Sequence, residues 1–544
     1  MVDAGTTSEG RPTGLRPGWI AVALALVAVL VYSRTLAYGY VYDDSIIAQS
    51  PLADRPFALA EIFSNGLYGA SSSDVALYRP LNDWTYLLTH AADRVLDPSG
   101  VRHVVGHAFN VLLHALATVL AFVWMLRCGL APRVAAAAGL LFAVLPVHAE
   151  SVANVTGRSD PLAVVFVLAM LLLHGSRWWA LAPAAYLFAL WSKESVLLLP
   201  LVAFACDAWI ARRPLRACLA RLAVDAAVAV VWVVLWRSAM RGPHIDPQPI
   251  ENPLAALAHG ARVVNALAIQ WDYLARIVIP VGLSTDYSLA TIPIVGATSP
   301  RCLGAVGGGL IAAAALVLCR RRAPLVSVSI AGYALAFAIT SNLALPIGTI
   351  MAERLAYLPS LFLCVLVALP LAPRSLAPAF ARAGFVVLVA AALVFALVTV
   401  RQCGVWKDEL TLFTEQVRTA PDSAKAHMNL AVALARAGRP REALPHYDRS
   451  IAIYPLYGHA WYSKGNALYR SGASDAEAAR CYAEAVRLSP RHQDAHANFA
   501  LTLLRLGRVE DARVERERLA ALNPEHPSLA VIDRRLASAG GAPR

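Results

Sequence analysis

Long apolar runs separated by short polar segments make up most of the first 400 residues. The first run, residues 19–38, is about 20 residues long, which is enough for a helix to cross a bilayer. The whole pattern predicts about eleven crossings, at residues 19–38, 104–126, 133–149, 160–175, 178–192, 195–210, 222–238, 303–319, 323–341, 355–371 and 379–400. The apolar stretch 254–281 is interpreted as interfacial helices, because another crossing there would move the arginines at 320–322 to the opposite face.

The arginines between the runs favour one orientation. The predicted crossings place them on a single face, as Arg127 with Arg133, Arg177, Arg212-Arg213-Arg216-Arg221, Arg320-Arg321-Arg322, and Arg374 with Arg382. Because positively charged loops stay in the cytoplasm, we expect this face and the polar tail 1–18 to be cytoplasmic. The arginine-rich loops on this face then account for the net charge of +12. The arginines form no single patch, so we expect no nucleic acid partner.

Composition supports a membrane protein. The chain has 544 residues, of which 58% are hydrophobic and 15% are charged. These values place most of it in the membrane class. We therefore expect a transmembrane domain over residues 19–400.

The character of the chain changes after residue 400. Pro421, Pro455, Pro490 and Pro524 recur 34, 35 and 34 residues apart, with Gly438 and Gly507 at matching turn positions. This is the tetratricopeptide period, in which each repeat is a pair of helices that stacks on its neighbours. The sequence thus predicts an all-α protein, with an α-solenoid over residues 401–544 on the non-cytoplasmic side.

The same topology brings unusual polar residues to the non-cytoplasmic face. Two adjacent acids, Asp43 and Asp44, follow the first crossing. The other groups are Tyr78-Arg79-Pro80, His148 with Glu150, Ser192-Lys193-Glu194, Asp286-Tyr287-Ser288, and Glu353-Arg354. Ionisable residues at membrane depth are costly unless they are paired or functional. So many groups on one face indicate a shared cavity.

These polar stretches, taken together, resemble the transmembrane and tetratricopeptide-repeat-containing O-mannosyltransferase family. The stretch Ala352-Glu353-Arg354-Leu355-Ala356-Tyr357-Leu358-Pro359-Ser360 is the most specific. The others are Asp43-Asp44, Tyr78-Arg79-Pro80-Leu81, His107 with Asn110 and His114, Pro146-Val147-His148-Ala149-Glu150, Gly157-Arg158-Ser159-Asp160, Ser192-Lys193-Glu194, Leu283-Ser284-Thr285-Asp286-Tyr287-Ser288, and Ser341-Asn342-Leu343. The chain has far fewer repeats than the large eukaryotic members.

The resemblance implies a polytopic C-type glycosyltransferase fold that takes a sugar, here mannose, from a polyprenyl-phosphate carrier. In such folds an acid on the first external loop serves as the base, a place that Asp43 and Asp44 occupy. Arg354, Arg79 and Lys193 are the candidates for binding the donor phosphate, since cations stabilise a leaving phosphate. The residues expected to bind or orient substrate are Tyr78, His148, Glu150, Glu194, Asp286 and Glu353.

Each candidate also has a structural interpretation. Arg354 can pair with Glu353 or Glu150. Lys193 and Glu194 can form a pair at the end of a span. Arg79 lies in a turn and can have the purely structural role of capping that loop. His148 and Glu150 are possible ligands of a divalent metal, although a hydrogen-bonded pair is commoner. No cofactor besides the lipid-linked sugar follows from the sequence.

The histidines and asparagine at positions 107, 110 and 114 share one helical face, which favours interhelical hydrogen bonds over substrate contact.

Three functions stay open. The first is a membrane glycosyltransferase acting on a protein or peptide acceptor that the repeats bind. The second is a non-catalytic, membrane-anchored repeat scaffold, and the third is a transferase acting on a cell-wall glycan or a lipid. The Ala- and Arg-rich composition indicates a bacterial inner membrane, with the repeats on the periplasmic or extracellular side. Intact acids at 43 and 44 and the arginine at 354 favour the enzyme.

Overall fold

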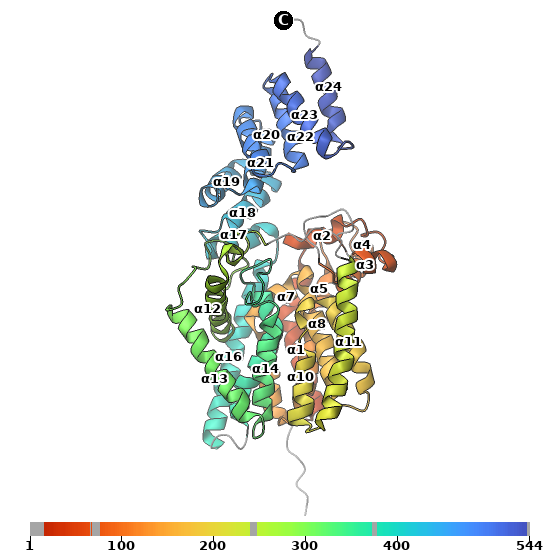
Figure 1. The fold of residues 1–544 in the computed structure, drawn as a ribbon, viewed down its shortest axis with the longest axis vertical. Coiled ribbons are helices and arrows are strands. Elements are labelled where there is room, and N and C mark those ends of the chain that lie inside the picture. Colours follow the sequence, from red (N-terminus) through yellow and green to blue (C-terminus); the bar gives the residue numbers. More distant parts are fainter. Residues whose placement is uncertain (1–15, 66, 68–76, 240–246, 373–377, 541–544) are drawn as a thin grey trace, which may run out of the picture. The chain divides into compact units, whose positions relative to one another are not determined.

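A computed structural model of the chain describes residues 16–65, 67, 77–239, 247–372 and 378–540. Within these ranges the chain is helical and has no β-strand. It divides into two compact units (Figure 1). The bundle unit comprises residues 1–243, 307–340 and 354–404, and the repeat unit comprises residues 244–306, 341–353 and 405–544.

The bundle unit is built mainly from α-helices joined by short 3-10 turns. Its α-helices are α1 (Pro17–Tyr32), α2 (Ser45–Gln49), α3 (Leu59–Asn65), α4 (Pro80–Leu96), α5 (Val104–Arg127), α6 (Pro132–Val144), α7 (Ala149–Ala153), α8 (Ser159–His174), α9 (Ala182–Ser192), α10 (Pro200–Ala205), α11 (Leu215–Ala239), α14 (Pro324–Ala338), α15 (Tyr357–Ala368), and most of α13 (Pro300–Cys319) and α16 (Pro378–Val405). The short elements are η1 (Ser33–Ala37), η2 (Tyr42–Asp44), η3 (Pro146–His148), η4 (Val155–Arg158), η5 (Trp179–Leu181), η6 (Glu194–Val196), η10 (Leu369–Leu371) and the π-helical η7 (Cys206–Ile210), while η9 (Glu353–Ala356) lies at the boundary between the units.

Among the described residues, seven helical segments are long and apolar enough to cross a membrane, which identifies an integral membrane protein. They are Pro17–Ala37, Val104–Arg127, Val155–His174, Leu215–Ala239, Pro300–Cys319, Glu353–Leu371 and Ala379–Val405. A bent pair, Pro132–Val144 with Pro146–Ala153, makes an eighth if it counts as one span, and two shorter apolar helices lie at Trp179–Ser192 and Pro324–Ala338. The predicted count of about eleven is therefore not confirmed within the described residues. The amphipathic α12 (His259–Val278), in the stretch interpreted as interfacial, is not among these candidates.

Small residues let the bundle helices approach closely. Helix α1 packs against α5 and α6, and α14 packs against α15. A Cβ added at Gly332 would lie 2.5 Å from the ring of Phe362, so only glycine fits where α14 meets α15. Close approach maximises van der Waals contact, which holds helices together where lipid removes the hydrophobic driving force.

Arg158 connects three segments of the bundle from a completely buried position. Its guanidinium donates hydrogen bonds to Thr85 O (2.8 Å), Thr89 Oγ1 (3.0 Å), Gly106 O (2.9 Å) and Asn110 Oδ1 (2.7 Å). The rings of Tyr86 and Phe109 lie 5.0 and 4.7 Å from it. Helices α4 and α5 are thereby fixed to η4, immediately before α8 begins.

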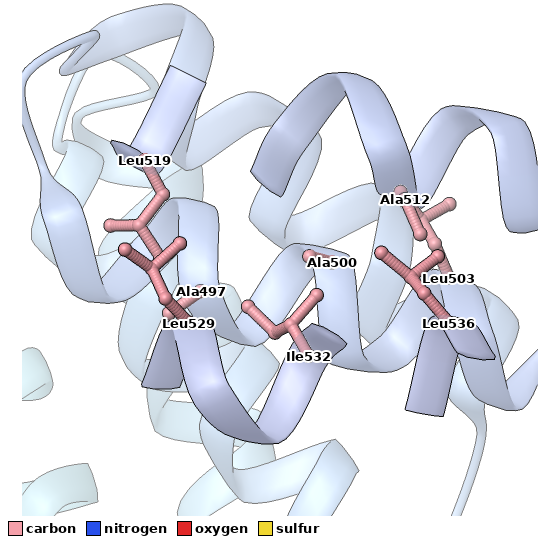
Figure 2. Close-up of a cluster of buried hydrophobic side chains, with 8 residues drawn as sticks. All are labelled: Ala497, Ala500, Leu503, Ala512, Leu519, Leu529, Ile532 and Leu536. Carbon is pink, nitrogen blue, oxygen red and sulfur yellow. The ribbon is translucent and has the colours of Figure 1, made fainter. Parts of the chain in front are cut away.

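The repeat unit consists of η8 (Pro253–Ala256), α12 and eight helices that form successive antiparallel pairs. The eight are α17 (Glu409–Thr419), α18 (Ala424–Arg436), α19 (Pro440–Ile453), α20 (Gly458–Ser471), α21 (Asp475–Leu488), α22 (Gln493–Arg505), α23 (Val509–Leu522) and α24 (Ser528–Gly540). Gly438 and Gly507 have φ of 77° and 74°, a left-handed conformation that glycine adopts without strain, and they end α18 and α22 as the repeat pattern predicts. Figure 2 shows the last core, where Ile532 and Leu536 of α24 pack beside Leu503 of α22.

Replacing Arg158 tests its role in the bundle. We expect Arg158→Lys to lower the free energy of unfolding by about 3 kcal/mol, because an ammonium cannot reach four acceptors that the planar guanidinium bonds at once. Thermal unfolding in detergent measures the change, with the exposed Arg177→Lys as the matched control. Equal melting temperatures for the two variants would contradict the assignment.

Candidate functional site

The two adjacent acids after α1 have different surroundings. Asp44 is completely buried, and its carboxylate accepts hydrogen bonds from the backbone N–H groups of Thr156 (2.7 Å), Val155 (3.3 Å) and Val41 (3.3 Å). Burial raises its pKa to about 7 against the opposing effect of these hydrogen bonds. Asp43 is exposed. Asp44 therefore ties the loop after α1 to η4, whereas the side chain of Asp43 has access to solvent.

Tyr42 starts this turn in an unusual conformation. Its φ is 55°, in the left-handed region that non-glycine residues seldom occupy. Such a conformation persists where the surrounding structure fixes it, and here the hydrogen bonds of Asp44, two residues later, supply that restraint. The strained turn is therefore anchored to η4 through Asp44.

Arg354 lies at the start of a crossing and pairs with Glu150. The guanidinium forms an ion pair with the carboxylate, and the Arg354 backbone N–H donates to Glu150 Oε2 at 3.0 Å. Glu150 is 5% exposed, whereas the Arg354 side chain is 39% exposed. Asp43 is close enough for its charge to act on Arg354. Glu150 therefore holds the guanidinium, while the Arg354 side chain keeps part of its surface exposed.

The other two predicted cations have their own acidic partners. Arg79 forms a bidentate pair with Glu194, with Nε–Oε2 at 2.8 Å and Nη2–Oε1 at 2.5 Å. Burial raises the pKa of the Glu194 carboxyl, but the Arg79 charge outweighs this and lowers it to about 2. Lys193 pairs with Asp160 at 2.6 Å, and both are buried. Arg79 and Lys193 are thus already engaged, although each was expected to bind the donor phosphate.

These pairs form one electrostatic cluster, the acid–arginine cluster. The Asp160 carboxylate interacts with the charges of Lys193, Arg354 and Arg79, so all three predicted cations lie near one another. The structure brings together Asp43, Arg79, Glu150, Asp160, Lys193, Glu194 and Arg354 from segments far apart in sequence. The shared cavity expected from the topology stays a prediction.

His148 and Tyr78 lie next to cluster residues but are themselves buried. Nε2 of His148 is 2.8 Å from Ser360 Oγ, and the Tyr357 ring lies 4.4 Å from the imidazole. In the part of the chain that the structure describes, no group of three or more His, Cys, Asp or Glu side chains could hold a metal. The side chain of His148 therefore contacts α15 and packs inside the bundle. Tyr78 is 5% exposed and directly precedes Arg79.

The shared-face residues of α5 make hydrogen bonds to other segments of the bundle. Asn110 donates to Asn154 O at 2.8 Å while accepting from Arg158. His114 bonds Tyr357 Oη at 2.7 Å and Ala143 O at 3.1 Å. His107 Nε2 lies 3.4 Å from Gly39 O, at the limit of a hydrogen bond. These contacts agree with the packing interpretation of the three positions.

Asp286 and Glu353 belong to the repeat unit. Glu353 Oε1 accepts hydrogen bonds from the Ser284 backbone N–H and the Tyr287 hydroxyl, both at 2.8 Å. The Asp286 carboxylate accepts from Ser288 Oγ at 2.8 Å and from Ser423 Oγ, the N-cap of α18, at 2.5 Å. Within this unit Asp286 ties the 283–288 loop to the N-cap of α18, and the Glu353 carboxylate holds the same loop through Ser284 and Tyr287.

The candidate set from the sequence omits Asp160 and Arg158. Asp160 is the partner that neutralises Lys193, and Arg158 holds the helices beneath the cluster. Both lie in the stretch Gly157-Arg158-Ser159-Asp160, which was part of the family resemblance. An acid at the beginning of a long apolar run is the signal that identifies Asp160 as a functional candidate.

Comparison with known families confirms the repeats. The tetratricopeptide repeat model matches residues 410–457, 428–479 and 476–528. These ranges cover helices α17 to α23 and agree with the period of about 34 residues.

Similar proteins cover most of this chain. Protein O-mannosyl-transferase F38B6.6 of Caenorhabditis elegans is 28% identical over 471 residues, covering 84% of this chain and 65% of that protein. Protein O-mannosyl-transferase TMTC1 of Homo sapiens is 27% identical over 528 residues, covering 84% of this chain and 57% of that protein. Protein O-mannosyl-transferase TMTC4 of Mus musculus is 26% identical over 507 residues, covering 80% of this chain and 66% of that protein.

The chain spans about 57 to 66% of the length of these three relatives. The match nevertheless extends through both the membrane helices and the repeats. The membrane bundle, the repeats and these relatives together confirm the resemblance: over most of its length the chain is homologous to the transmembrane and tetratricopeptide-repeat O-mannosyltransferases.

Proposed function

We propose that this protein is an integral-membrane glycosyltransferase that moves a sugar, mannose, from a polyprenyl-phosphate donor to a hydroxyl of a protein acceptor. The observation that carries the proposal is the proximity of an exposed acid, Asp43, to the partly exposed side chain of Arg354. A base and a phosphate-binding cation are the two groups that such a transfer requires. The homologues named as O-mannosyl-transferases support the choice of sugar and acceptor.

In the proposed reaction the acceptor oxygen attacks the anomeric carbon of the sugar. Asp43 takes the proton of the acceptor hydroxyl as the new C–O bond forms. The bond between the anomeric carbon and the phosphate oxygen breaks, and its electron pair leaves with the polyprenyl phosphate. Arg354 donates hydrogen bonds to that phosphate as its negative charge grows.

The neighbouring ion pairs prepare Arg354 for this role. The Glu150 carboxylate accepts from both the guanidinium and the backbone N–H of Arg354, so the guanidinium needs no reorientation when the phosphate arrives. Arg79 and Lys193 are engaged by Glu194 and Asp160, and we assign them to the positive field around the phosphate rather than to direct contact. This division follows from exposure, because the Lys193 side chain is 4% exposed.

The repeats suit a protein acceptor. A stack of helix pairs presents an extended concave surface that binds peptides or partner helices. Asn466 of α20 accepts hydrogen bonds from Asn498 of α22 and from Tyr482 of α21, which links neighbouring repeats. We propose that this unit captures the acceptor segment. Donor and acceptor are both placed on the non-cytoplasmic side in this scheme.

The direct test uses purified protein in detergent with radiolabelled polyprenyl-phosphate mannose. We expect label to pass to a hydroxyl-bearing polypeptide from the membrane or periplasmic fraction, and the same assay without polypeptide serves as the control. Label recovered only in lipid or glycan would redirect the acceptor assignment. No transfer to any fraction, by a protein that binds the donor, would favour the scaffold.

Asp43→Asn separates the catalytic role of this acid from that of its neighbour. Loss of the general base should lower turnover roughly 100- to 10,000-fold. The melting temperature should stay near that of the wild type, because Asp43 is exposed. Turnover is measured by label transfer, and thermal unfolding is measured on the same sample. Wild-type turnover would place the base elsewhere.

Asp44→Asn is the matched control and should act on stability. The amide replaces one acceptor oxygen with a donor that faces backbone N–H groups, at a cost of about 1–3 kcal/mol. Since its folded pKa of about 7 lies above the ordinary value of 3.8, the folded protein binds an extra proton between those values. Wild-type stability should therefore fall as pH rises from about 4 to about 7, and Asp44→Asn should lose that slope.

Arg354→Lys tests bidentate phosphate contact. A lysine keeps the charge but not the planar fork, so we expect a stable protein with turnover and donor affinity reduced by at least about tenfold. The companion is the charge-swapped pair Glu150→Arg with Arg354→Glu. If Arg354 served only to pair with Glu150, the swap would recover activity together with stability. Full activity of Arg354→Lys would exclude the bidentate contact.

A further inference from the structure

A cavity of about 610 Å³ lies in the bundle unit, away from the segments that form the acid–arginine cluster. It is lined by Ala208, Trp209, Arg212, Arg320 and Arg321. The lining comes from the turn that joins η7 to α11 and from the turn that joins α13 to α14. In Figure 1 both turns lie at the end of the bundle opposite α2 and α4. The proposed transfer uses none of these residues.

Packing of the helices brings the two turns together. The π-helical segment η7 contacts α14, as does α10 before it, which places Trp209 and Arg212 beside the beginning of α14. Arg212 has φ of 50°, a left-handed conformation that is costly for an arginine. The folded chain thus keeps a strained turn at a residue that lines the cavity.

The charges around the cavity are unbalanced. Among the described residues, no carboxylate forms an ion pair or hydrogen bond with Arg212, Arg320 or Arg321. The next residue in the chain, Arg213, differs because it bonds Asp207 at 3.0 Å. Three guanidinium groups around one cavity repel each other, and an anion in the cavity would relieve that repulsion.

A phosphate group fits the chemistry of the lining. Guanidinium groups bind phosphate oxygens through paired hydrogen bonds. Trp209 is half-buried, and tryptophan ring systems favour the level of the lipid headgroups. Positive charge from loops alone would account for exposed arginines, but not for their convergence with a tryptophan on a cavity.

The surface next to the cavity favours a lipid as the source of that phosphate. Only 6% of the most apolar stretch of α13 is buried inside the protein. Its last turns expose Val317 and Leu318, immediately before Arg320. Acyl chains lying along this helix would bring a headgroup to the arginines. We propose that the cavity binds the phosphate of an anionic phospholipid.

The test compares two probes on detergent-purified protein, phosphatidylglycerol and inorganic phosphate, with phosphatidylcholine as the uncharged reference lipid. We expect phosphatidylglycerol to raise the melting temperature of the wild type in a saturable way. In the double variant Arg320→Gln/Arg321→Gln, the apparent dissociation constant should rise about 25-fold, which corresponds to about fivefold for each arginine near an anionic surface.

The matched control is Arg216→Gln/Arg382→Gln, which removes two exposed arginines outside the cavity. It should bind phosphatidylglycerol as the wild type does. A second variant, Arg212→Gln, tests the other wall and should weaken binding about fivefold. Lipid-free melting temperatures of all variants establish that they are folded.

Two outcomes would overturn the proposal. Equal losses in the cavity variant and the control variant would mean that the lipid responds only to overall positive charge. Stabilisation by inorganic phosphate with none by phosphatidylglycerol would assign the cavity to a soluble phosphate compound. Transfer of label from the polyprenyl donor is a separate measurement, so failure of this proposal leaves the proposed activity untouched.

Discussion

Charged groups buried at membrane depth must find their partners within the protein, because lipid offers none. Arg158 meets this requirement with four different acceptors from α4 and α5, without a carboxylate among its hydrogen-bond partners. The guanidinium therefore fixes the relative positions of both helices and of η4. Residues on these segments then have defined places, including Asp160, two residues further along the chain. The geometry of the acid–arginine cluster depends on this arrangement.

The need to pair buried charges also explains why some residues of the acid–arginine cluster are buried and others are exposed. Asp44, Glu150, Asp160 and Lys193 are buried and have hydrogen-bond partners, so they contribute structure and field. Asp43 and Arg354 retain exposure to a substrate. A site that transfers a sugar from a charged lipid needs few contacting groups but a strong, fixed field behind them. The proposed mechanism follows from that division.

The repeat unit uses a different set of constraints. Its helices are held by alanine, leucine and glycine contacts, such as Gly465 against the ring of Tyr482, where a Cβ would come within 2.8 Å. Left-handed glycines end several helices, and serine or aspartate side chains cap the beginnings of others. This unit also contains the 283–288 loop, fixed by Asp286 and Glu353.

Local and periodic features were readable from the sequence by itself. Runs of about 20 apolar residues, the proline spacing and the turn glycines at 438 and 507 depend on a few neighbouring residues, so the all-helical membrane bundle and the repeats could be predicted. The number of crossings does not follow from composition alone, because a bent pair such as α6 with η3 and α7, or a helix of 15 residues such as α14, has the composition of a span without its length or continuity. Motif resemblance also placed Asp43, Arg79, Glu150, Lys193, Glu194 and Arg354 in one candidate set.

Only the tertiary structure decided which of these residues pair with one another. Arg354 has Glu150 rather than Glu353 as its partner, Arg79 takes Glu194, and Lys193 takes Asp160. It also distinguished Asp43 from Asp44, two identical side chains in adjacent positions. Partner choice and exposure depend on residues more than 100 positions apart, such as Thr156 for Asp44 and Glu150 for Arg354. No local pattern encodes such distances, because packing of the helices sets them.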